Sequence, residues 1–237
     1  MKYLAVFIFW CLQFSSSYAD QNSFKDTHQL ELLAHKLSSE FAAFIYFEGQ
    51  QKYLIQAEKT AKQGQALIPT AITDKAAQAD IAKYWQEAME FINSNASASF
   101  NGIEMRLEAG WSLHMLELIE KISNYKKTLT APELTSNGKV IFELQIEIER
   151  LLSQYMKLAN STTGGYGVSR SGDPIEAKVE RISKMMTQLE DKPALNKIKR
   201  KWTYIEKTIL KYNENIAPYI VIHVVNDLRK LTQQQLK

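Results

Sequence analysis

The sequence predicts an all-α protein, an elongated up-down-up-down antiparallel four-helix bundle with interrupted helices. Apolar side chains recur every three or four residues along most of the chain, the spacing that places side chains on one helix face. No competing segment alternates apolar and polar residues as a half-buried strand does. Four rods result: 27–65, 74–129, 138–190 and 194–236. Short connections between successive rods favour antiparallel neighbours.

The first 19 residues have the layout of a secretory signal peptide. Lys2 precedes a run at 3–14 that is apolar except for Gln13, and a serine-rich stretch then ends at Ala19. We expect cleavage after Ala19 and a periplasmic or secreted protein. An uncleaved anchor is the alternative, although the run is shorter than the roughly 20 residues that a membrane span needs.

Residues 20–237 are then expected to form a single helical-bundle domain. The chain has 29 Lys and Arg residues against 26 Asp and Glu residues, so it is close to neutral. This balance argues against a basic face for nucleic acid. The only cysteine, Cys11, lies in the expected signal peptide, so we expect neither a disulfide nor a thiolate metal site in the mature chain.

The first rod, 27–65, is expected to begin at a pair of capping residues, Asp26 and Thr27. Its apolar stripe follows helical spacing: Leu30, Ala34, Leu37, Phe41 and Phe44. Gly49 lies inside this rod, at a cost of up to about 1 kcal/mol relative to alanine. Two interpretations of Gly49 stay open, a close approach of a backbone or ligand, and a tolerated surface glycine.

The second rod, 74–129, is interrupted at 93–99 by short polar residues that compete for backbone hydrogen bonds. We expect two coaxial or slightly bent segments on either side of this interruption. A turn at 130–138, which contains Pro132 and Gly138, leads into the third rod.

The third rod, 138–190, carries the most regular apolar seam of the chain: Ile141, Leu144, Ile148, Leu151, Tyr155 and Leu158. Its glycine-rich interruption at 160–173 is expected to be a mobile loop. After this loop, Asp173 is expected to cap a new helix with Pro174 in its first turn.

The last rod, 194–236, begins after Pro193 and has one apolar face, on which Trp202 and Ile205 lie. Pro218 is expected to kink this helix. The apolar run that follows is too short to span a membrane.

A polar stretch in the first rod marks the candidate functional region. We call residues 49–59 the first stretch. Continuing the three- and four-residue spacing of the apolar stripe brings Glu48 and Gln51 toward the buried side, where polar groups need partners. Residues 148–157, the second stretch, are similar. Aligned, the two stretches pair Lys52 with Arg150, Leu54 with Leu152, Gln56 with Gln154 and Lys59 with Lys157.

Together the two stretches resemble the doubled motif of the N-terminal sensory domain of type IV pilus methyl-accepting chemotaxis transducers and related nitrate-sensor input domains. That motif runs Gly-Arg-Gln-Arg-Met-Leu-Ser-Gln-Arg. The residues kept are Gly49, Gln51, Leu54 and Gln56 in the first stretch, and Arg150, Leu152, Ser153 and Gln154 in the second. Lys52 replaces the central arginine in the first stretch, and Ala57 and Tyr155 replace the closing arginines. The family's anion binding therefore does not carry over unchanged.

No catalytic pattern accompanies these stretches, and we expect neither an enzyme nor a cofactor. A di-iron bundle needs a Glu-x-x-His pair on each of two helices, and the sequence has none. His28, Glu31 and His35 share one helix face and would suit zinc, but no further ligands are evident, so the alternative is a solvated helix start. We expect no metal site.

The sequence thus predicts a non-enzymatic periplasmic sensory or ligand-binding bundle that acts through a protein partner such as a membrane sensor. The expected ligand is a small anion. Lys52 and Arg150 would supply charge, and amides and a hydroxyl would orient the ligand. The expected ligand-binding residues are Gln51, Lys52, Gln56, Arg150, Ser153 and Gln154. The alternative is a structural bundle, a spacer or homodimerisation module without a small-molecule ligand.

Overall fold

The computed structural model describes residues 2–97, 104–162 and 173–236. Within these ranges the chain forms eight α-helices and no strand, so the predicted all-α fold class is confirmed. Most of the expected glycine-rich loop lies outside the described residues. The helices are α1 (Lys2–Tyr46), α2 (Gln51–Ala71), α3 (Lys75–Asn95), α4 (Glu104–Lys127), α5 (Ser136–Thr162), α6 (Ile175–Gln188), α7 (Pro193–Leu210) and α8 (Pro218–Gln234).

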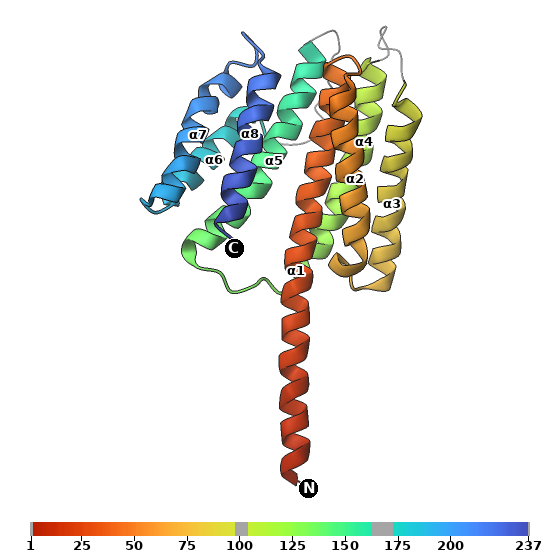
Figure 1. Cartoon of the computed structure of the whole chain (residues 1–237), viewed down its shortest axis with the longest axis vertical. Helices are drawn as coiled ribbons and strands as arrows, with labels where there is room; N and C mark the ends of the chain where they lie inside the picture. The colour runs from red at the N-terminus through yellow and green to blue at the C-terminus, as the bar shows by residue number, and fades with distance from the viewer. Residues whose placement is uncertain (1, 98–103, 163–172, 237) are drawn as a thin grey trace.

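These helices outnumber the four expected rods because the chain reverses where interruptions were expected. Each rod is a pair of helices that pack against each other: α1 with α2, α3 with α4, α5 with α6, and α7 with α8. Figure 1 shows the partners of each pair side by side. The coaxial arrangement expected within 74–129 is therefore wrong, and Pro218 begins α8 instead of kinking a continuous helix.

The first reversal depends on Glu48 and Gly49. Both adopt left-handed backbone angles, with φ of 50° and 81°. Glycine adopts such angles without a steric penalty, and two in succession end α1. The amide of Gly49 donates to the carbonyl oxygen of Phe44 at 2.9 Å, which satisfies part of the helix end. Gly49 is thus a turn residue that lies outside both helices.

Asp26 and Thr27 do not start a helix, because α1 runs through them without a break. Thr27 is buried, and its hydroxyl lies 2.7 Å from the carbonyl oxygens of both Ser23 and Ala71. It therefore ties α1 to the end of α2. Residues 2–19, expected to be a signal peptide, form the part of α1 that projects beyond the other helices in Figure 1.

The structure shows a side-chain cap at α3, and the cap expected at α6 is wrong. Asp74 precedes α3, and its carboxylate accepts from the backbone amide of Ala77 at 2.8 Å. Asp173 was expected to cap α6, but no side chain caps this helix, and the Asp173 carboxylate pairs instead with Arg181.

The eight helices form two groups of four consecutive helices, α1–α4 and α5–α8, joined along α1 and α5 (Figure 1). Three contacts show that α1 and α5 run parallel: His28 with Gln145, Ser38 with Ser153, and Glu31 with Arg150. Their sequence separations stay between 115 and 119. On one side of this pair α2 and α8 approach each other, where Lys52 lies over the ring of Tyr219. On the other side lie α4 and α6, which supply Lys126 and Arg181 to carboxylates of the pair.

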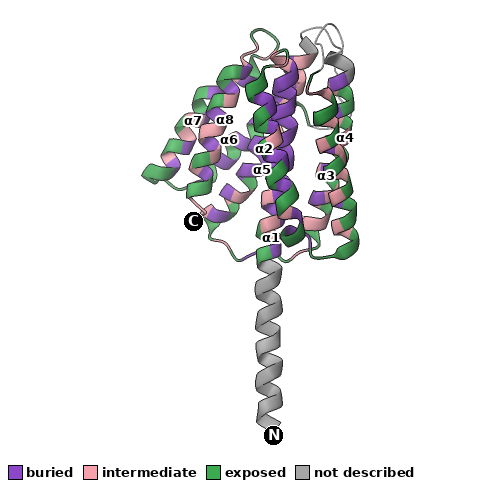
Figure 2. Ribbon diagram, turned by 45° about the vertical axis from the view of Figure 1, so that its right-hand side comes forward, coloured by how far each residue is buried: buried purple, intermediate pink, exposed green. Residues whose placement is uncertain are grey.

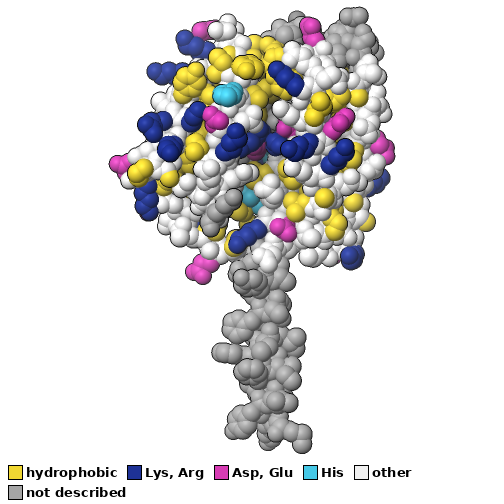
Figure 3. Space-filling view, in the orientation of Figure 1, with side chains coloured by type: hydrophobic (Ala, Val, Ile, Leu, Met, Phe, Trp, Pro, Cys, Tyr) yellow, Lys and Arg dark blue, Asp and Glu magenta, His cyan; other side chains and the backbone are white. Residues whose placement is uncertain are grey.

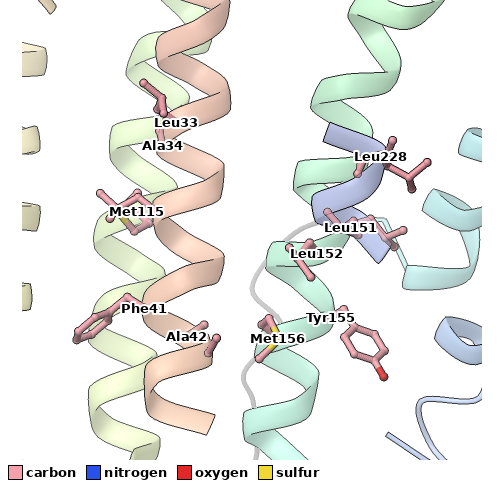
Figure 4. Packing of buried hydrophobic residues seen from close by; sticks show 14 of the residues in the cluster. Leu33, Ala34, Phe41, Ala42, Met115, Leu151, Leu152, Tyr155, Met156 and Leu228 are labelled. Atoms are coloured by element: carbon pink, nitrogen blue, oxygen red, sulfur yellow. The ribbon is translucent and has the colours of Figure 1, made fainter. Parts of the chain in front are cut away.

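A single hydrophobic core runs through both groups. Buried residues are densest on α1 and α5 (Figure 2), because each of these helices is covered by at least three others. Phe41 and Met115 lie between α1 and α4, and Leu151 and Leu228 lie between α5 and α8 (Figure 4). The predicted seam is confirmed at five positions that are at most 2% exposed: Ile141, Leu144, Ile148, Leu151 and Tyr155. Leu158, its last member, is only partly buried. Within the described residues no helix has the length and apolar character needed to cross a membrane.

Candidate functional site: a polar cluster between the two helix groups

The face of α1 that meets α5 is polar. His28, Glu31, His35 and Ser38 recur at helical spacing and are all buried. Parallel helix pairs ordinarily place apolar side chains at such positions. This stretch was expected to be a solvated helix start, and that expectation is wrong because α1 is covered by α2, α4 and α5.

Two of these residues, His28 and Ser38, make uncharged contacts with α5. His28 Nε2 lies 3.2 Å from Gln145 Oε1, and its ring stacks on Phe142. Ser38 and Ser153 share a hydrogen bond of 3.0 Å between their hydroxyls. Burial, assisted by the charge of Lys126, lowers the pKa of His28 to about 3, although its contact with Gln145 opposes this shift. His28 is therefore a neutral, structural residue near pH 7.

Glu31 lies at the centre of a charge network that joins four helices. Its carboxylate has no exposed surface and pairs with Lys126 of α4 and, at 3.4 Å, with Arg150 of α5. Arg150 also pairs with Glu147 at 2.9 Å, and Glu147 accepts from Arg181 of α6 at 3.0 Å. Arg150 is thus held between two carboxylates.

His35 lies next to this network without a hydrogen bond to its Nε2 atom. The residue is 6% exposed. Burial holds the pKa of His35 well below its usual range, and the charges of Arg150, Lys157, Lys126 and Lys178 lower it further. An unpaired polar atom in a buried site costs free energy. A negatively charged group beside His35 would relieve this cost and balance the cations.

Gln154 and Lys157 extend the site along one stripe of α5. The positions 147, 150, 154 and 157 follow helical spacing, so they share a face with Arg150. Gln154 Nε2 donates to the carbonyl oxygen of Asp173 at 3.2 Å, whereas its Oε1 is buried and has no partner. Lys157 makes no ion pair among the described residues. We call His35, Lys126, Arg150, Gln154, Lys157 and Lys178 the His35 cluster.

Glu108, the carboxyl group whose charge acts on Lys157, does not fully neutralise it. Burial raises the pKa of Glu108 to about 7, against hydrogen bonds from Ser112 and Asn160 and the charge of Lys157. Burial in turn lowers the pKa of Lys157, and Glu108 opposes that shift. Near pH 7 Glu108 is therefore only partly ionised, which leaves positive charge in the His35 cluster.

Solvent can reach the edge of the His35 cluster. The side chains of Arg150 and Arg181 are 37% and 43% exposed. Cationic groups around His35 outnumber the carboxylates Glu31, Glu147 and Asp173. This excess of positive charge would favour an anion over a cation at the cluster. Glu31 is occupied by cations, and among the described side chains no group of metal-binding residues could hold a metal ion.

The structure brings together only the second half of the sequence-predicted site. Arg150, Ser153 and Gln154 lie on α5 at or beside the His35 cluster. Gln51, Lys52 and Gln56 are exposed on α2. Lys52 Nζ lies over the rings of Tyr53 and Tyr219, at 4.7 and 5.7 Å from their centres. The contacts of Lys52 and Arg150 share no residue.

The opposite side of the α1–α5 pair is closed by charge pairs. Arg229 of α8 binds both carboxylate oxygens of Glu149, with Nη2 at 2.6 Å from Oε2. A cavity of about 40 Å³ beside them has room for only a few water molecules. Figure 3 shows this face, where basic side chains form a band across α8, α1 and α2.

Sequence reasoning missed most of the His35 cluster. His35 was considered only as a zinc ligand, and Lys126 and Lys178 were not singled out. One signal in the sequence was the row of polar residues at 28, 31, 35 and 38, which share one face of a largely apolar helix. Polar side chains repeated on successive turns of such a helix indicate that another segment supplies them with polar partners. Comparisons with family models, curated proteins and solved structures find no match to this chain. Function is therefore inferred from the residues of the site.

Proposed function

We propose that the chain is a non-enzymatic sensory or ligand-binding module that takes a small anion at the His35 cluster and acts through a protein partner. One observation carries this proposal: the Nε2 atom of His35 is buried without a partner while cations from α4, α5 and α6 surround it. An anion bound there would accept hydrogen bonds from charged donors, which are stronger than those between neutral groups.

The position of the His35 cluster supports a sensory role. Its residues come from α1 and α4 of the first helix group and from α5 and α6 of the second. An anion that bridges Lys126 and Lys178 would favour one packing of the two groups over another. A ligand shifts a conformational equilibrium only through such a difference in affinity between the two states.

The proposal also covers architecture and location. An up-down-up-down four-helix arrangement is proposed for each group, α1–α4 and α5–α8, separately. Residues 1–19 are proposed to be a signal peptide that directs the chain to the periplasm or outside the cell, on the evidence of their sequence layout. The partner would be a membrane sensor, another protein or a second copy of the chain.

Thermal unfolding in the presence of small anions tests the proposal. The panel contains nitrate, bicarbonate, phosphate, acetate and chloride, each at constant ionic strength. A bound anion at 100 times its dissociation constant stabilises the folded protein by about 2.7 kcal/mol. Lys157→Met should abolish this shift, and Lys52→Met should retain it. No shift with any anion, or an equal loss in both variants, would contradict the proposal.

The second candidate function is a structural bundle without a small-molecule ligand. It is favoured by the pairing of Arg150 with Glu31 and Glu147, since these carboxylates already occupy its guanidinium group. Under this alternative the anion panel would leave the unfolding midpoint unchanged, while Arg150→Ala would lower the ligand-free stability by about 3–5 kcal/mol.

A further inference from the structure

The orientation of the Gln154 side-chain amide is fixed by its neighbours. Its Nε2 donates to the carbonyl oxygen of Asp173 at 3.2 Å, and the same carbonyl accepts from Lys178 Nζ at 3.1 Å. Rotating the amide by half a turn would place Oε1 against that carbonyl oxygen, two acceptors in contact. The unpartnered atom of Gln154 is therefore its oxygen.

This oxygen constrains what can bind. A carboxamide oxygen only accepts hydrogen bonds, and leaving it buried without a donor costs free energy. Nitrate, chloride and sulfate have no hydrogen to donate, so they would leave Gln154 Oε1 unsatisfied and repel it. An anion that carries its own O–H or N–H group would satisfy it.

Gln154 and His35 lie at the same level of the α1–α5 pair. The pairing of residues 115 to 119 apart places His35 opposite residues 150–154. Gln154 shares its stripe of α5 with Arg150 and Lys157, two of the cations that act on His35. A ligand that neutralises these cations is therefore within reach of Gln154 Oε1.

We infer that the ligand is a small anion bearing its own hydrogen-bond donor, and that Gln154 selects it. The cations of the His35 cluster bind the anionic oxygens of the ligand, and Gln154 Oε1 accepts a hydrogen bond from the ligand's O–H or N–H group. Bicarbonate, dihydrogen phosphate and hydroxycarboxylates belong to this class. The inference rests on the proposed function, because it concerns the anion of the same site.

Nitrate and bicarbonate make the sharpest test. Both are planar, singly charged and built of three oxygens around one atom, and bicarbonate differs by one O–H group. Calorimetric titration in closed cells at pH 8 should show bicarbonate binding at least about tenfold more tightly than nitrate, the factor that one satisfied hydrogen bond provides. Equal binding of the two anions would overturn the inference while leaving the proposed function intact. Binding of neither would contradict both.

Gln154→Met shows whether Gln154 is the selecting residue. The variant keeps the length of the side chain and removes the acceptor, so bicarbonate should bind about tenfold more weakly while nitrate binding stays unchanged. Gln63→Met makes the same exchange at an exposed position of α2 and should keep the full preference. A preference that survives in Gln154→Met would overturn the assignment. If Gln154→Met does not fold, the comparison of the two anions on the unmodified protein still decides the ligand class.

Discussion

The first and second stretches align residue by residue but occupy opposite environments. Ser153 is 7% exposed, whereas Ile55, the residue aligned with it, is 61% exposed. Arg150 reaches the fully buried Glu31, whereas the exposed Lys52 lies over the rings of Tyr53 and Tyr219. The polar Ser153 is thus buried, and the apolar Ile55 at the aligned position is exposed.

The difference follows from where each stretch lies in the fold. The first stretch begins α2 directly after the reversal at Gly49, and α2 turns one face to solvent. The second lies in the middle of α5, which α1, α6 and α8 cover. A similar series of residues therefore builds a site only when its helix is surrounded by others.

The largest expected contrast between the stretches is in apolar packing. Leu151→Ala should lower the free energy of unfolding by about 2–5 kcal/mol, because Leu151 is 1% exposed and its removal leaves a cavity. Ile55→Ala should change it by less than about 0.5 kcal/mol, as expected for a surface position. Urea unfolding of both variants measures this difference. A loss below about 1 kcal/mol for Leu151→Ala would mean that the seam is not core.

Acid should lower the free energy of unfolding through the histidines that α1 buries against α5. The pKa of His28 is about 3 in the folded protein against 6.5 in the unfolded chain, so the unfolded state binds more protons between these values. Stability should therefore fall as the pH drops from 6.5 toward 3, by about 3 kcal/mol at pH 4 from this residue. His35, whose pKa is also lowered, adds to the fall.

Unfolding midpoints at pH 7 and pH 4 test this expectation in His28→Gln. The variant should lose about 3 kcal/mol less than the unmodified protein over this interval. His223→Gln, which removes an exposed histidine of α8, should follow the unmodified protein. Identical pH dependence in all three proteins would show that His28 is not buried in its neutral form.

A smaller loss of stability is expected when the aligned charged residues Arg150 and Lys52 are truncated. Arg150→Ala should lower ligand-free stability by about 1–2 kcal/mol, less than for a fully stranded carboxylate, because Lys126 still pairs with Glu31. Lys52→Ala should cost less than about 1 kcal/mol, since its contacts with rings are exposed. Thermal unfolding without added anions measures both. A loss of several kcal/mol for Arg150→Ala would favour the structural bundle.

The smallest effect concerns the hydroxyl pair. Ser153→Ala should cost about 1 kcal/mol, because it leaves the buried Ser38 hydroxyl without this partner. The double variant Ser38→Ala, Ser153→Ala should recover most of that loss, since both polar groups are then absent. Additive losses in the double variant would show that the two hydroxyls do not interact.

Helical periodicity predicted the fold class and the core because it is a local property. The seam from Ile141 to Tyr155 was identified correctly from its spacing alone. The reversals were missed because polar residues at 93–99 and a glycine at 49 fit an interrupted rod as well as a turn. What decided the first reversal was the left-handed backbone of both Glu48 and Gly49, which residue types do not specify.

The candidate site was predictable only where a motif marked it. Arg150 and Gln154 were singled out by the resemblance of the second stretch to a known motif. His35 joins them through the parallel pairing of α1 with α5, across more than a hundred residues of sequence. A contact at this separation leaves no local pattern, so no spacing of residues could indicate that His35 and Lys157 belong to one site.

The parallel pairing of α1 with α5 also sets the order in which the chain can assemble. During synthesis α1 meets α2 and α4 well before α5 exists, and domains tend to form from the N-terminus. In that interval the stripe of His28, Glu31 and His35 faces water, and Lys126 of α4 is already present to pair with Glu31. An apolar stripe at this place would expose the half-made protein to aggregation. The polar stripe would leave less apolar surface exposed until the second half of the chain is made.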